Sequence, residues 1–160
     1  MTNAFPASSA SLGDTDCTLK ASLIWPGKLE ISKPHADRLA QLLDDEEQPR
    51  LPTSWALGTR ALLALRTGDA EAAVDYVAES EQLGPIDLAR PFIQAVRAMA
   101  HMELNHTGEA KAALAKAKQL ITSLKEDPVK KDQHDTLIAE ILIREAEAKI
   151  NGKNDSTNGS

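Results

Sequence analysis

Apolar residues recur three and four positions apart along most of the chain, in segments that are separated by turn residues. This spacing predicts amphipathic helices with one buried face. Gly68 and Asn105 each follow such a segment, and both residue types readily adopt the left-handed conformation that ends a helix. The clearest predicted helices cover residues of about 53 to 67, 69 to 83, 87 to 104 and 107 to 124.

Three further helices are predicted around this central part. One covers about 15 to 25 and ends at Pro26 and Gly27, and another begins near Pro34 and ends before Pro49. The last covers about 134 to 150 and suits a terminal cap with a polar outer face. Its predicted buried side contains Leu137, Ile138, Ile141, Leu142 and Ala146.

The helices form an internal repeat. Ala36, Ala73 and Ala110 lie 37 residues apart, and residues 61–80 align with residues 98–117. A period of 20 to 50 residues built from helix, turn and helix is typical of a stacked α-solenoid, whose units cannot bury their apolar faces alone. We therefore expect Ala73 and Ala110 to lie where neighbouring helices approach closely.

Composition supports an all-α fold. Hydrophobic residues make up 42% of the chain but aromatic residues only 3%, whereas strands favour aromatic and β-branched residues. We predict a right-handed solenoid of about seven antiparallel helices over residues 14–150. The small, polar segments 1–13 and 151–160 are expected to be disordered.

Net charge and the absence of targeting signals limit the classes of function and the cellular location that we expect. The formal charge of -6 argues against general binding to nucleic acid or anionic membranes, which requires clustered Lys and Arg. Cys17 has no cysteine to pair with, and there is neither a leader pattern nor an apolar run of 18 residues. These features predict a cytoplasmic protein.

The segments LALRTGDAEAAVDYVAESEQLGP and MELNHTGEAKAALAKAKQLI resemble the tetratricopeptide repeat, from the second half of its helix A through the turn and helix B. The sequence departs from this family in its period of 37 rather than 34, and in Ala64 and His101 at the helix A aromatic position. The family positions matched in the first clear repeat are Ala61, Gly68, Asp69, Ala73, Leu83 and Pro85. In the second they are Ala98, Ala110, Ala117 and Leu120.

A second resemblance concerns the end of the chain. The phrase AMAHMELNHTGEAKAALAKA followed by HDTLIAEILIREAEA is similar to the C-terminal repeat segments of planctomycete-type bacterial serine/threonine kinases. That similarity implies a docking or scaffold segment. The chain has no Gly-rich phosphate loop and no HRD or DFG motif, so we expect a non-enzymatic protein.

Candidate chemistry is sparse. The four histidines have no cysteine partners and no i, i+4 pairing, so neither a metal nor another cofactor is expected. Lys111, Lys118 and Lys125 recur every seven residues along one helix. This stripe is either part of a docking surface or an ordinary solvated face.

The resemblance to tetratricopeptide repeats implies a concave groove lined by the first helix of each hairpin. In this groove, an apolar helix or peptide of a partner protein would bind. The same residues can instead form core, and an oligomerising subunit that uses this face for self-association is the alternative function. The predicted lining contains Trp55, Gly58, Leu62, Leu65 and Arg66 from one repeat and Phe92, Ala95, Met99, Met102 and Glu103 from the next.

Overall fold

The computed structural model describes residues 12–24, 29–44 and 53–157, and these residues form helices joined by turns, with no strand among them. The all-α prediction is confirmed for this part of the chain. Its seven helices are α1 (Leu12–Leu23), α2 (Leu29–Asp44), α3 (Thr53–Arg66), α4 (Ala70–Gln82), α5 (Arg90–Glu103), α6 (Thr107–Glu126) and α7 (His134–Thr157).

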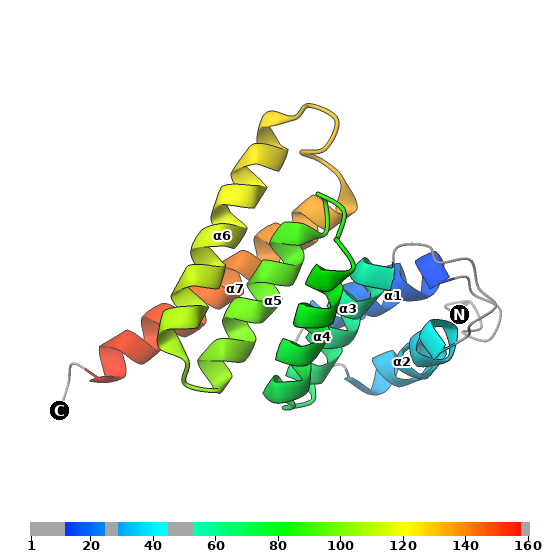
Figure 1. Ribbon diagram of the computed structural model, residues 1–160, viewed down its shortest axis with the longest axis horizontal. Coiled ribbons are helices and arrows are strands. Elements are labelled where there is room, and N and C mark those ends of the chain that lie inside the picture. The colour runs from blue at the N-terminus through cyan, green and yellow to red at the C-terminus, as the bar shows by residue number, and fades with distance from the viewer. Residues whose placement is uncertain (1–11, 25–28, 45–52, 158–160) are drawn as a thin grey trace.

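The helices pack mainly against neighbours in the chain. Three pairs form hairpins, α1 with α2, α3 with α4, and α5 with α6, and the first helix of each hairpin also contacts the first helix of the next. The last helix, α7, packs on both α5 and α6. In Figure 1 it crosses behind these two helices, so that its start lies towards α3 and its far end extends past α6.

Local backbone chemistry sets the hairpin turns. Gly68 has φ 87° and Asn105 has φ 62°, which places both in the predicted left-handed region. The Asp69 side chain accepts a hydrogen bond from the backbone N–H of Ala72 at 3.0 Å, as expected of an N-cap. Thr107 belongs to a residue type that often caps helices, but it is the first residue of α6, and the N-cap residue is His106.

Several predicted helix ends differ from the structure. The second helix begins at Leu29 and contains Pro34, and α5 begins at Arg90, three residues after the expected start. The final helix continues to Thr157, beyond the predicted end at 150. The remaining residues of the predicted disordered ends, 1–11 and 158–160, lie outside the described residues.

Two small residues of the repeat lie in the core. Ala73 and Ala110 are fully buried, as is expected of residues between packed helices. The buried side of α7 was predicted less well, because Leu137 and Ile141 are 49% and 43% exposed. Since α7 packs against two helices, α5 and α6, its buried arc is rotated and contains Ile138, Ala139, Leu142, Ile143, Ala146 and Ile150.

Within the described segments, no helix is both long and apolar enough to cross a membrane.

Candidate functional site

Most of the predicted groove lining is buried. Leu62, Ala95 and Met99 have no exposed surface, and Phe92 is 2% exposed. A Cβ atom on Gly58 would lie 2.8 Å from Phe92 Cε1, so α3 and α5 touch at this glycine. Leu65 and Met102 are buried as well. These side chains are core in this structure, which is the alternative that the sequence left open beside an open groove.

The C-terminal helix accounts for part of this burial. Arg66, which was predicted to line the groove, donates two hydrogen bonds to Glu145 of α7 at 2.5 and 2.6 Å. Glu103 is exposed, and it accepts a hydrogen bond from Lys149 of α7 at 2.7 Å. Helix α7 therefore pairs with both charged residues of the predicted lining, and it packs along α5. Helix α7 thus covers part of the face on which a partner helix was expected.

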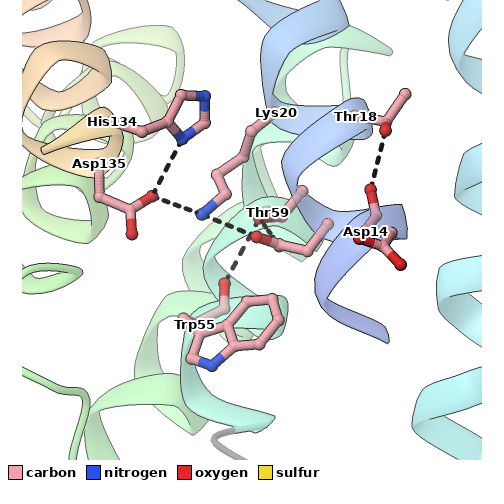
Figure 2. Close-up of polar contacts among 8 residues, drawn as sticks. Asp14, Thr18, Lys20, Trp55, Thr59, His134 and Asp135 are labelled. Carbon is pink, nitrogen blue, oxygen red and sulfur yellow. Dashed lines mark hydrogen bonds and ion pairs between the residues drawn. The ribbon is translucent and has the colours of Figure 1, made fainter. Parts of the chain in front are cut away.

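The two aromatic residues of the predicted lining, Trp55 and Phe92, lie near the ammonium group of Lys20. Lys20 Nζ lies 5.5 Å from the Trp55 ring centroid and 5.6 Å from the Phe92 ring centroid. These distances are within the range of cation–π attraction. Figure 2 shows Lys20 extending from α1, with Trp55 and Thr59 of α3 close by. The half-buried Trp55 thus contacts a charged group of its own chain.

Two carboxylates complete the surroundings of Lys20. The ammonium lies 2.7 Å from Asp16 Oδ2 and 2.8 Å from Asp135 Oδ1. Thr59 donates a hydrogen bond to Asp16 Oδ1, whereas Asp16 Oδ2 has the ion pair with Lys20 but no hydrogen bond of its own. Lys20 is 4% exposed, and Asp16 and Thr59 are fully buried. We call Asp16, Lys20, Trp55, Phe92 and Asp135 the ammonium cluster.

Burial shifts the ionisation of the cluster. It raises the pKa of Asp16 from 3.8 to about 6, although Lys20 and Thr59 both favour the charged form. Burial also disfavours the charged form of Lys20, but the fields of Asp16 and Asp135 outweigh it and raise the pKa of the ammonium. Both groups are therefore charged at pH 7, and the charge on Asp16 carries a desolvation cost.

That cost makes stability depend on pH. Because folding raises the pKa of Asp16, this carboxyl group is protonated to a greater extent in the folded state than in the unfolded state between pH 3.8 and about 6. Stability from this group therefore increases as pH falls through 6. From pH 7 to 4.5, we expect the free energy of unfolding to rise by about 1–3 kcal/mol relative to that of Asp16→Asn. Urea unfolding of both proteins at each pH measures this, and parallel pH profiles would contradict it.

The predicted lysine stripe divides between two environments. Lys118 forms an ion pair with Glu147, and Lys125 forms one with Glu140, so both connect α6 to α7. Lys111 is exposed. Two of the three ammonium groups thus pair within the chain, which favours the solvated-face interpretation over a continuous docking stripe.

A hollow of about 350 Å³ lies where α4, α5 and α6 meet. A second hollow of about 220 Å³ continues it and shares Gln94, Arg97 and Lys116. We call the two together the α4–α6 hollow. The larger part is lined by Glu81, Gly84, Pro85, Arg90, Ile93, Gln94, Arg97, Lys116 and Leu120, and Glu109, Ala112 and Ala113 add to the smaller part.

Polar side chains converge in the α4–α6 hollow. Glu81 accepts hydrogen bonds from Gln94 and from Arg97 Nη1, the latter at 2.9 Å, and Lys116 Nζ lies 4.0 Å from the same carboxylate. Arg97 and Lys116 are 38% and 58% exposed at their side chains. Buried Ile93 forms part of the apolar floor. The hollow therefore combines an apolar base with accessible cations.

The sequence interpretation did not identify either feature. A signal for the ammonium cluster was present, because Asp16 and Lys20 share a helix side with Leu19 and Leu23, where charged residues are unexpected. No comparable local pattern indicates the hollow, since its lining comes from three helices. The described residues contain no group of His, Cys, Asp and Glu suited to hold a metal ion.

Comparison with protein-family models, with curated proteins and with solved structures finds no match for this sequence.

Proposed function

We propose that this chain is a tetratricopeptide-like solenoid that acts as a non-enzymatic protein-interaction module. The repeat of 37 residues and the resemblance of its hairpins to tetratricopeptide repeats support this. So does the packing, in which the first helix of each hairpin contacts the first helix of the next. A chain built in this way presents extended surfaces between successive hairpins.

The α4–α6 hollow is the proposed binding surface, and its partner is an acidic peptide segment. The observation that carries this proposal is its charge. Arg90, Arg97 and Lys116 line the larger part with Glu81 as the only carboxylate, in a chain whose formal charge is -6. Carboxylates of a partner would pair with exposed donors of Arg97 and Lys116, while an apolar residue would contact the floor near Ile93.

The dimensions of the hollow set the length of this segment. Along α6 it extends from Glu109 to Leu120, which is about 16 Å at the rise of an α-helix. An extended peptide covers that distance with about five residues. The predicted concave groove is a weaker candidate, because a partner would have to displace α7 and expose its six buried apolar residues.

Selection of peptides on the immobilised protein tests the proposal. We expect acidic segments to be enriched, with micromolar affinities that weaken as salt is added, since the lining charges are partly exposed. Lys116→Glu reverses a charge at the hollow and should weaken binding of a selected peptide at least tenfold by fluorescence anisotropy. Lys111→Glu is the matched control, because this exposed lysine of α6 lies outside the hollow.

The two variants separate the possible outcomes. Equal losses for Lys111→Glu and Lys116→Glu would indicate general charge attraction and would contradict a site in the hollow. Loss in Trp55→Ala, with full binding retained by Lys116→Glu, would instead place the partner at the predicted concave face. Selection of peptides without acidic residues would reject the proposed partner class.

Self-association is the second candidate function. Leu137 and Ile141 lie one turn apart on α7 and are both substantially exposed, so they form an apolar patch on this helix. Size-exclusion chromatography with light scattering distinguishes this function. A dimer that Ile141→Glu converts to a monomer would support it, whereas a monomeric wild-type chain would reject it.

A further inference from the structure

The ammonium of Lys20 is surrounded by groups that belong mostly to other helices. Trp55 comes from α3, Phe92 from α5 and Asp135 from α7, whereas only Asp16 shares α1 with the lysine. Residues 20 and 135 are separated by 115 positions in the chain. Three of the four groups around the ammonium thus come from helices other than α1.

We propose that Trp55, Phe92, Asp135 and Asp16 form a binding site for a primary alkylammonium group, which Lys20 fills from within the chain. An amine from solution occupies the same site when that side chain is removed. Lys20 is thus a built-in ligand, and its removal turns an internal contact into a site for a small amine.

The geometry fits a primary ammonium better than other groups of similar size. A primary ammonium has three N–H donors, and two carboxylate oxygens lie 2.7 and 2.8 Å from Lys20 Nζ on different helices. The rings of Trp55 and Phe92 lie close enough to Lys20 Nζ to attract its positive charge. An alcohol lacks the charge, and a quaternary ammonium has no N–H to donate.

Other contacts keep α1 in place when Lys20 is shortened. Leu19 and Leu23 are buried in the core. Arg66 Nε donates a hydrogen bond to the backbone oxygen of Leu23 at 2.9 Å, and Thr59 binds Asp16. Lys20→Ala removes three carbons and the ammonium but retains these contacts. The space it leaves has the size of n-propylammonium.

Thermal unfolding of the full chain at pH 7 tests the proposal. At 0.1 M n-propylammonium chloride and a Kd of about 10 mM, we expect the midpoint of Lys20→Ala to rise by about 3 °C or more over 0.1 M NaCl. The same concentration of n-propanol or tetramethylammonium chloride should leave the midpoint within about 1 °C. If Lys20→Ala is unfolded at 25 °C, recovery of helical circular dichroism with n-propylammonium replaces the midpoint as the measurement.

Two further variants test whether the stabilisation by n-propylammonium arises at the site that Lys20 vacates. Lys118→Ala removes an exposed lysine of an ion pair, and it should show no response specific to n-propylammonium. In Lys20→Ala with Asp135→Asn, the response should fall at least tenfold in apparent affinity, because one of the two carboxylates is lost. Absence of any response in Lys20→Ala, or the same response in Lys118→Ala, would overturn the proposal.

Discussion

Gly58→Leu is expected to destabilise the protein by about 3 kcal/mol, because the new side chain has no space. A Cβ at this position would lie 2.8 Å from Phe92 Cε1 and 2.9 Å from Ile93 Cγ1, and leucine adds three more carbons. Both neighbours are buried on α5, so α3 and α5 would have to separate. Urea unfolding monitored by circular dichroism measures the change.

Alanine substitutions provide the matched control. Gly108 lies in the first part of α6 with open space around its Cβ position, so Gly108→Ala should be neutral or stabilise by up to about 1 kcal/mol. Gly58→Ala gains the same helix propensity, but the overlap of its Cβ with Phe92 and Ile93 costs more than that gain. We therefore expect Gly58→Ala to destabilise the protein by about 1 kcal/mol. A Gly58→Leu protein with wild-type stability would show that this face is open, as the sequence-based groove hypothesis requires.

Arg66→Met is expected to destabilise the protein by about 2–3 kcal/mol. The Arg66 side chain is 8% exposed, and it connects three helices through its bonds to Glu145 of α7 and to the Leu23 backbone oxygen at the end of α1. Methionine retains much of the packing but removes the donor of the Glu145 carboxylate and of the Leu23 backbone oxygen, and breaking a largely buried ion pair is costly. Urea unfolding again measures the loss.

Lys118→Met is the control for Arg66→Met. Its ion pair with Glu147 also connects to α7, but the side chain is 52% exposed, and exposed pairs contribute about 0–1 kcal/mol. We therefore expect a change below about 1 kcal/mol. Equal effects of the two substitutions would contradict a structural role for Arg66 between α1, α3 and α7.

These substitutions bear on the main difference between expectation and structure. Gly58 and Arg66 were both predicted to contact a partner, yet one packs against α5 and the other binds α7. If they stabilise the fold as expected, the first-helix face is largely internal. The α4–α6 hollow and the exposed patch of α7 are then the surfaces that we propose for a partner.

Sequence by itself determined the local structure of the central hairpins. Gly68 and Asn105 take left-handed conformations, and Asp69 caps α4, because these preferences belong to the residue and its immediate backbone. Ala73 and Ala110 are buried because the repeat places small residues where paired helices approach. Each of these features depends on interactions within a few turns of the chain.

Only the tertiary structure decided which helix faces meet. Helical periodicity marks an apolar face but does not say whether solvent, a partner or another helix of the same chain covers it. Lys20 and Asp135, like Arg66 and Glu145, meet across 115 and 79 positions of sequence. Because such contacts depend on how α1 and α7 lie against α3 and α5, the ammonium cluster, the buried first-helix face and the exposed Leu137 and Ile141 follow from packing.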